Sequence, residues 1–334
     1  MVDTPRLEFI GGGQIRYYSL ARYALMDALR IVGVKPGSRI LLPAYLCRDL
    51  LAPLHILGCH ALWYQVAPDM TPADPPDIWP LSDVVLAINY FGFPQNLKPF
   101  EVYAARTGAL VIEDNAHGYL SQDLTGRWLG CRTGLGIFSF RKTLRIPDGG
   151  ALLVGEKYSL QKLPEETAQF GRGLNRAQLI KAQLRILPVV GEFAYRGSIA
   201  LARAMRKLRT GNTTPMSDPE SEQLIPAEGR PWIGLLPALQ TLNNEYEIQR
   251  RRRAYLECAK LGLKVGAVPV FSSLPLNCAP YGYPFRGELS TRVALRKYAD
   301  VQGFDFVPWP DLPSTVEPNA PKHYQDVFLV NFLW

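Results

Sequence analysis

One segment, residues 111–150, constrains what this chain can fold into more than any other. It opens with an apolar run and an acidic pair that ends at Asp114, and His117 follows. After a short β-type run come Lys142 and the glycine pair at 149–150. An acid at the end of a buried strand lies at the carboxyl edge of an open α/β sheet, where such sheets bind their ligands. The segment therefore predicts a ligand site.

The residue types in this segment indicate a particular ligand. A carboxylate such as Asp114 needs a cationic partner, and the ring nitrogen of pyridoxal phosphate is one when an acid keeps it protonated. The aldehyde of that cofactor bonds to an amine, and Lys142 is expected at a strand end. Ser139, three residues earlier, carries a hydroxyl that can donate to a phosphate. These residues predict a lysine-bound pyridoxal phosphate.

The start of the chain offers a second part of such a site, a helix over residues 19–31. Ser19 is a favoured type of N-cap residue, and Gly33 ends the pattern. The backbone N–H groups of Ala21 and Arg22 would point outward with the positive end of the helix dipole. This helix start is therefore expected to bind the cofactor phosphate.

Apolar and amphipathic runs alternate along the first 155 residues. Such alternation predicts a mostly parallel sheet covered by helices. We expect strands over 39–43, 61–65, 83–89 and 109–112, helices over 49–57 and 97–107, and a strand pair from 128–140 and 150–154.

Five segments between residues 17 and 155 occur in a fixed order, at 19–25, 37–45, 89–94, 113–117 and 138–150. Together they resemble the DegT/DnrJ/EryC1/StrS family of sugar aminotransferases, which are pyridoxal-phosphate-dependent enzymes of fold type I. The resemblance implies an α/β fold with a mostly parallel central sheet and a smaller C-terminal α+β domain. It also implies a homodimer whose partner chain supplies a phosphate ligand, for which Asn175 and Arg176 are candidates.

The resemblance implies roles for the central residues. Lys142 would hold the cofactor as an internal aldimine and then act as general base at the Cα of an amino donor. Asp114 would keep the ring nitrogen protonated, and His117 would lie beside the phenolic oxygen of the ring. The donor would be glutamate, and the acceptor would be a nucleotide-linked keto-sugar.

Two features depart from the family pattern. The family places an aromatic ring over the cofactor a few residues after Pro43, where this chain offers Tyr45. Counting from the proline favours Cys47, which cannot stack, so Tyr45 is either the ring cover or a core aromatic. The spacing from Ser139 to Lys142 is also shorter than in many members.

The C-terminal part is expected to form a smaller domain, 231–334, behind a large cofactor-binding domain, 1–230. A long helix over 232–261 leads into it. Arg286 lies there and is a candidate ligand for a donor carboxylate or an acceptor phosphate, because a guanidinium binds such groups with two parallel hydrogen bonds. The alternative is a surface arginine.

A basic segment, residues 171–210, lies within a helical insertion over about 165–225. It holds nine Lys or Arg and one Glu, whereas the whole chain has a net charge of +7. Apolar residues at near-helical spacing favour helices that pack on the body and leave the arginines solvated. The alternatives are weak peripheral contact with anionic lipid and nucleic-acid binding. The pattern favours packing on the body, and no nucleic-acid partner is expected.

Cysteine spacing and hydropathy bear on disulfides, metal sites and cellular location. Five scattered cysteines without a CxxC pair argue against a disulfide framework or a structural zinc site. We expect no metal. No apolar run approaches the roughly 18 residues needed to span a bilayer, and the first five residues lack a charged-then-apolar signal. A cytoplasmic location is expected.

A second function class stays open, namely a pyridoxal-fold protein that has lost turnover and serves as a regulator or binding partner. The chain length of 334 residues leaves room for an incomplete small domain and an altered activity. Family relatives that catalyse dehydration carry histidine in place of the lysine, and Lys142 argues against that variant.

Overall fold

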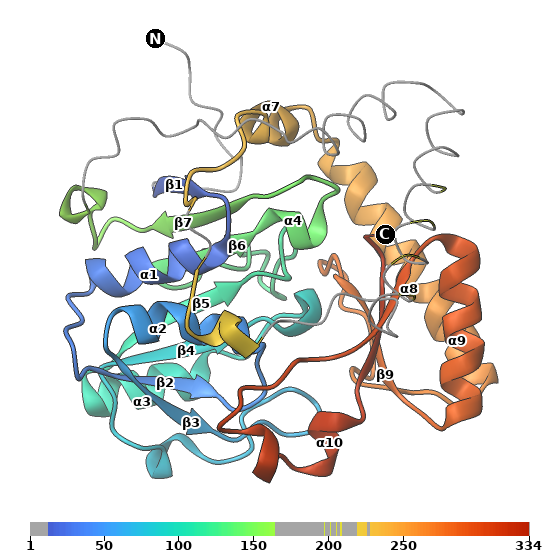
Figure 1. Ribbon diagram of the computed structural model, residues 1–334, viewed down its shortest axis with the longest axis horizontal. Coiled ribbons are helices and arrows are strands. Elements are labelled where there is room, and N and C mark those ends of the chain that lie inside the picture. Colours follow the sequence, from blue (N-terminus) through green and yellow to red (C-terminus); the bar gives the residue numbers. More distant parts are fainter. Residues whose placement is uncertain are drawn as a thin grey trace.

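The computed structural model describes residues 13–163, 219–225 and 228–333, together with the single positions 197, 201, 205 and 208 (Figure 1). Those four positions aside, the basic segment 171–210 lies outside the described residues, and so do Asn175 and Arg176. The predicted packing of that segment and its contact with lipid stay predictions.

A seven-stranded sheet occupies the N-terminal half, in the order β1-β7-β6-β5-β4-β2-β3. The strands β3, β2, β4, β5 and β6 are parallel, whereas β7 runs antiparallel to both β6 and β1. The predicted mostly parallel sheet is thereby confirmed. All five residues of β4 are buried, as expected of a parallel strand covered on both faces. The strand bounds are β1 Gln14–Tyr18, β2 Arg39–Pro43, β3 His60–Tyr64, β4 Val84–Ile88, β5 Leu110–Asn115, β6 Leu135–Ser139 and β7 Gly150–Val154.

Three helices cover this sheet: α1 Ala21–Ile31, α2 Ala52–Ile56 and α3 Lys98–Thr107. Helix α1 packs on β6 and β7, and α3 packs on β4 and β5. The prediction that Ser19 caps α1 was wrong, because the N-cap position is Leu20. The hydroxyl of Ser19 instead donates to the backbone oxygen of Glu228, 2.8 Å away.

The C-terminal part builds a second, four-stranded antiparallel sheet in the order β10-β11-β9-β8. Helices α8 and α9 lie side by side against it (Figure 1). The predicted single helix over 232–261 is two helices, because the side chain of Asn243 accepts from the backbone N–H of Tyr246 and starts α8 anew. The bounds are α7 Leu235–Gln240, α8 Asn244–Lys264, β8 Val268–Pro269, β9 Gly282–Arg286, α9 Leu289–Gln302, β10 Asp305–Pro308, α10 Lys322–Gln325 and β11 Phe328–Asn331.

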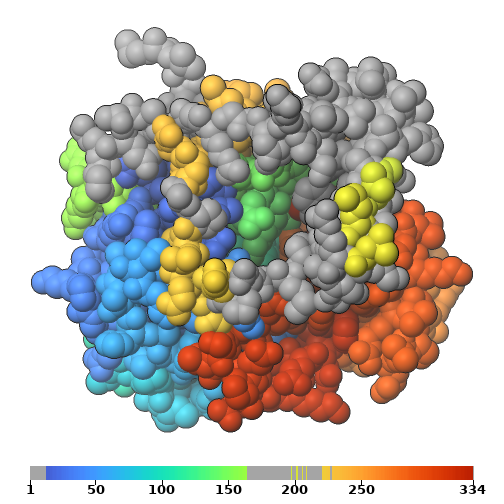
Figure 2. Space-filling view, in the orientation of Figure 1, coloured from blue at the N-terminus to red at the C-terminus, as the bar shows by residue number. Residues whose placement is uncertain are grey.

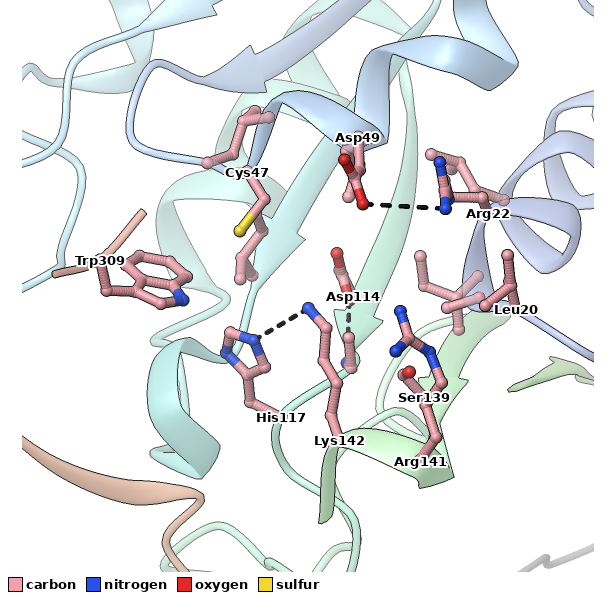
Figure 3. A pocket seen from close by; sticks show the side chains of 17 residues that line it. Leu20, Arg22, Cys47, Asp49, Asp114, His117, Ser139, Arg141, Lys142 and Trp309 are labelled. Atoms are coloured by element: carbon pink, nitrogen blue, oxygen red, sulfur yellow. Dashed lines mark hydrogen bonds and ion pairs between the residues drawn. The ribbon is translucent and has the colours of Figure 1, made fainter. Parts of the chain in front are cut away.

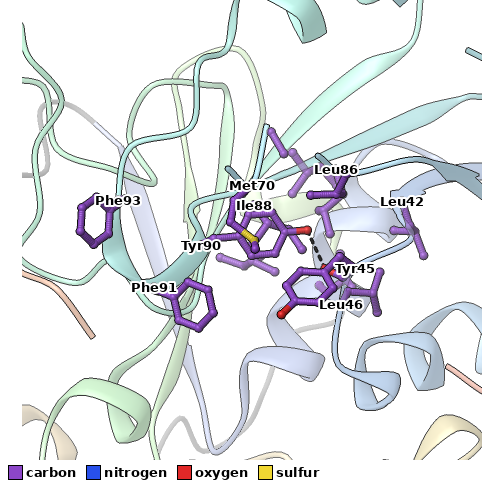
Figure 4. Close-up of a cluster of buried hydrophobic side chains, with 14 of the residues drawn as sticks. Leu42, Tyr45, Leu46, Met70, Leu86, Ile88, Tyr90, Phe91 and Phe93 are labelled. Carbon is purple, nitrogen blue, oxygen red and sulfur yellow. Dashed lines mark hydrogen bonds between the residues drawn. The ribbon is translucent and has the colours of Figure 1, made fainter. Parts of the chain in front are cut away.

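Buried aromatic residues join the two halves. Tyr90 donates from its hydroxyl to the backbone oxygen of Tyr45 at 2.6 Å (Figure 4). Tyr45 in turn donates to the backbone oxygen of Trp309, which follows β10, at 2.8 Å. In the space-filling view the red C-terminal residues lie directly against the blue and cyan N-terminal half (Figure 2). These contacts bring Trp309 to the carboxyl edge of the large sheet.

Two further findings concern the cysteines and the hydrophobicity of the helices. All five cysteines have free thiols. Within the part of the chain that the structure describes, no helix combines the length and the apolar character that a membrane crossing needs.

The glycine pair at 149–150 lies where β7 meets the start of α1. Gly149 has φ +143°, which disfavours any residue with a side chain, and its N–H donates to the backbone oxygen of Ser19 at 2.8 Å. A Cβ at Gly150 would lie 2.6 Å from the backbone nitrogen of Ala21. The pair therefore allows the first turn of α1 to approach the sheet closely.

We expect Gly150→Ala to lower the free energy of unfolding by about 1–3 kcal/mol, because the added methyl group forces α1 away from β7. Gly155→Ala is the matched control, since a Cβ there meets nothing nearer than the backbone oxygen of Gly134 at 3.4 Å. Urea unfolding of both variants measures the effect. If Gly150→Ala were as stable as Gly155→Ala, the start of α1 would be able to move away from β7 without loss of stability.

Candidate active site

A cavity of about 150 Å³ opens at the carboxyl edge of the large sheet (Figure 3). The ends of β4, β5 and β6 form its floor, the start of α1 closes one side, and the segment after β2 closes another. Neighbouring parallel strands end at the same edge of a sheet, which is why residues far apart in the sequence meet here. The polar residues that line it are Arg22, Asp49, Asp114, His117, Ser139, Arg141 and Lys142.

Lys142 and His117 face each other in this cavity. Lys142 belongs to the single turn α4, Phe140–Thr143, which follows β6 directly, and His117 follows β5. The two side chains meet with 3.2 Å between Lys142 Nζ and His117 Nε2. The predicted presentation of the lysine at a strand end is thus what the structure shows.

Asp114 lies on the floor of the cavity with 3% of its surface exposed. Burial raises the pKa of its carboxyl group to about 6, although the N–H of Ala116, which donates to Oδ1 at 2.9 Å, and the nearby Lys142 act in the opposite direction. The neighbouring acid, Glu113, points to the other face of the strand and pairs with Arg132 at 2.7 Å. Asp114, unlike Glu113, has no ion pair among the described residues and lies at the floor of the cavity.

The imidazole of His117 is fixed from several directions. Its ring stacks on Tyr281, with 4.6 Å between centroids and 3° between planes. The backbone N–H of Phe91 donates to Nδ1 at 3.3 Å. Burial, with the charge of Lys142 next, holds the pKa of His117 well below its ordinary value, so the ring is neutral. Nδ1 accepts from the backbone, and Nε2 is the atom that faces Lys142 in the cavity.

The opposite end of the cavity carries positive charge. Ala21, the first residue of α1, lines it together with Ser139. Arg141 also lines it, and its buried Nε has no hydrogen-bond partner among the described residues. Arg22 lies nearby, with its Nη2 3.8 Å from Asp49 Oδ2. The sequence predicted Ala21, Ser139 and the backbone of Arg22. It missed Arg141, whose only signal was its place beside Lys142, and Asp49, which no local pattern marked.

The structure does not bring Tyr45 or Arg286 to the cavity. Tyr45 is fully buried in the aromatic cluster, which corrects its assignment as a ring cover. Arg286 donates from Nη2 to the backbone oxygen of Pro68 at 2.8 Å, and its side chain is not part of the lining. Cys47 does line the cavity, and so does Trp309, which sequence reasoning missed. Burial raises the pKa of the Cys47 thiol to about 11, so it stays protonated at neutral pH.

Residues 18–174 match the DegT/DnrJ/EryC1/StrS aminotransferase family. The resemblance seen in the sequence is thus found again over a segment that makes up slightly less than half of the chain. It contains each of the cavity residues from Ala21 to Lys142, so the family match and the geometry converge on the same part of the chain.

One curated relative aligns with about half of the chain. Protein MosB of Rhizobium meliloti is 30% identical over 173 residues, which are 49% of this chain and 33% of MosB. The chain thus spans about a third of the length of this curated relative.

Solved structures share the fold at low sequence identity. DesV of S. venezuelae, solved with a ketimine intermediate, has a TM-score of 0.62 at 19% identity over 97% of this chain and 81% of DesV. The aminotransferase TlmJ of Streptoalloteichus hindustanus has a TM-score of 0.58 at 20% identity over 95% and 80%. The E coli GDP-4-keto-6-deoxy-D-mannose-3-dehydratase has a TM-score of 0.58 at 13% identity over 97% and 84%. The shared architecture confirms the predicted fold type I.

Proposed function

We propose that this protein is a pyridoxal-phosphate-dependent aminotransferase that moves an amino group from an amino acid to the keto group of a sugar. The observation that carries the proposal is the convergence of Lys142, His117 and Asp114 on one cavity, with 3.2 Å between the lysine amine and the imidazole. The match of residues 18–174 to an aminotransferase family supports amino transfer. Glutamate as the donor and a nucleotide-linked acceptor follow from the family resemblance.

The residues of the cavity fit this cofactor at both ends. Asp114 is a buried carboxylate with a raised pKa, and a cationic ring nitrogen would give it the partner it lacks. At the other end, the buried Nε of Arg141 has no hydrogen-bond partner within the described part of the chain. When bound, the protonated ring serves as an electron sink for the pair released from a substrate C–H bond.

Each lining residue then has a distinct task. Lys142 supplies the amine that attaches the cofactor, and its free amine takes a proton from the donor Cα and returns one to the acceptor carbon. His117 lies with Nε2 3.2 Å from the lysine amine and restricts where that amine can move. Asp114 stays ionised once it faces a cation. Cys47 and Trp309 line the cavity and would shield the reacting atoms from water.

The visible spectrum of the purified protein with added pyridoxal phosphate tests this function. We expect a yellow protein whose band is lost when glutamate is added, and borohydride reduction is expected to fix the label on Lys142. A colourless protein that takes up no cofactor would overturn the assignment. A protein that holds the cofactor but reacts with no amino donor would favour the regulator or binding partner instead.

A homodimer is part of the same proposal, because the family resemblance implies a phosphate ligand from a partner chain. Light scattering during size-exclusion chromatography measures the mass directly. We expect twice the mass of the 37.4 kDa chain. A monomer that still binds cofactor would show that this chain completes its own site.

A further inference from the structure

Three charged side chains meet at the α1 end of the cavity: Arg22, Asp49 and Arg141 (Figure 3). Each comes from a different element. Arg22 lies in the first turn of α1, Asp49 lies in the short turn Arg48–Leu51 after β2, and Arg141 lies in α4 beside Lys142. Two of them, Asp49 and Arg141, each have a buried polar atom without a hydrogen-bond partner among the described residues.

Arg141 is the clearest case. Its Nε is buried and has no hydrogen-bond partner among the residues that the structure describes. Burial lowers the pKa of its guanidinium, and the like charge of Arg22 lowers it further, whereas Asp49 and Asp148 act in the opposite direction. A buried N–H without a partner is costly, and a buried charge costs more, so such a group is expected to meet an anion in the working state.

Asp49 and Arg22 form only a loose pair. Asp49 Oδ2 lies 3.8 Å from Arg22 Nη2, which is beyond hydrogen-bond distance, and Asp49 Oδ1 is buried without a hydrogen-bond partner in the described part of the chain. An anion that reaches the cavity would therefore compete with Asp49 for the guanidinium of Arg22. The carboxylate also repels that anion directly.

The remaining groups at this end suit a dianion. Helix α1 has eleven residues and presents its N-terminal backbone here, beginning at Ala21. The hydroxyl of Ser139 lies in the same lining. Two guanidiniums, a helix start and a hydroxyl match a phosphate, with up to two charges and three terminal oxygens, better than they match a single carboxylate.

We infer that the guanidinium of Arg141 binds the phosphate group of the cofactor, and that Asp49 limits the strength of this anion site by engaging Arg22. The inference rests on the proposed function. It assigns opposite effects to two residues of one site: Arg141 strengthens phosphate binding, and Asp49 weakens it.

The test compares pyridoxal phosphate with pyridoxal, which lacks the phosphate, in titrations of cofactor-free protein followed by absorbance. The dissociation constant of pyridoxal divided by that of pyridoxal phosphate is the ratio that measures how much the phosphate strengthens binding. We expect Arg141→Gln to reduce this ratio roughly 10- to 100-fold while the affinity for pyridoxal stays the same. We expect Asp49→Asn to increase the ratio about two- to fivefold, because the pair it breaks is partly exposed.

Arg145→Gln is the matched control. Arg145 lies four residues beyond Arg141, its Nε donates to the backbone oxygen of Leu333 at 2.9 Å, and it does not line the cavity. We expect its ratio to equal that of the unaltered protein. Because Asp49→Asn moves the ratio upward, damage to the fold cannot produce the expected pair of results.

The outcomes separate the inference from the proposed function. If the unaltered protein binds pyridoxal phosphate but Arg141→Gln keeps the same ratio, or loses both ligands equally, the inference is overturned and the function stands. If the unaltered protein binds neither ligand, the proposed function fails and the inference fails with it. An unchanged ratio in Asp49→Asn would overturn the part assigned to Asp49.

Discussion

Lys142→Ala is expected to lower the rate of the half-reaction with an amino donor by at least about 10²–10⁴-fold. The substitution removes both the amine that attaches the cofactor and the base that moves the proton. In the structure the lysine amine lies 3.2 Å from a neutral, buried imidazole. An imidazole whose pKa is held well below its ordinary value is a weak base, so it does not replace the lost amine.

Single-turnover absorbance measurements with glutamate give this rate directly, and borohydride reduction gives an independent result. The variant is expected to bind pyridoxal phosphate reversibly and to yield no labelled peptide after reduction. Lys162→Ala is the control, because Lys162 is exposed in the turn Leu160–Lys162 and lies outside the cavity. A rate for Lys142→Ala within about tenfold of the original would mean that another group acts as the base.

The centre of the site could be predicted from the sequence because it depends on strand ends. Asp114 lies at the end of one parallel strand and Lys142 follows the neighbouring strand, so any chain with that strand order brings such residues to one edge. His117 needs only the short turn after β5. No detail of side-chain packing is required for any of these three.

Other parts of the site depend on contacts that no local pattern encodes. Trp309 reaches the cavity because the second sheet docks on the first, and it follows β10, far from the family segment. The segment after β2 is irregular, so the alternation of a strand does not decide which residue faces the ligand, and Cys47 lines the cavity instead of Tyr45. Ser19 lost its predicted role as a cap to a contact with Glu228, 209 positions later in the chain.

Asp114→Asn is expected to stabilise the cofactor-free protein at neutral pH. The pKa of Asp114 rises from an ordinary value of 3.8 to about 6 in the folded state, chiefly through burial. Between these values the folded state binds more protons than the unfolded state, so stability falls as the pH rises. The whole shift corresponds to about 3 kcal/mol of lost stability above pH 6. The asparagine retains an oxygen that can accept from Ala116 and carries no charge, so it avoids this loss.

Urea unfolding of the cofactor-free protein at about pH 4 and about pH 7 measures the effect. We expect the variant and the original protein to be similar at the lower pH and to differ most at the higher one. Asp77→Asn, on an exposed turn, is the control and is expected to leave both values unchanged. If Asp114→Asn gains no stability at the higher pH, the carboxylate is already satisfied without a ligand, and the argument for a cationic partner fails.

The same substitution is expected to lower the half-reaction rate by about 10²–10³-fold, because the ring nitrogen loses the carboxylate that keeps it protonated. Added pyridoxal phosphate should also stabilise the original protein more than the variant, since only the original forms an ion pair with the ring. The two effects have opposite signs: the charge that destabilises the empty cavity is the charge that the reaction uses. If the carboxylate served folding alone, Asp114→Asn would neither lower the half-reaction rate nor stabilise the cofactor-free protein.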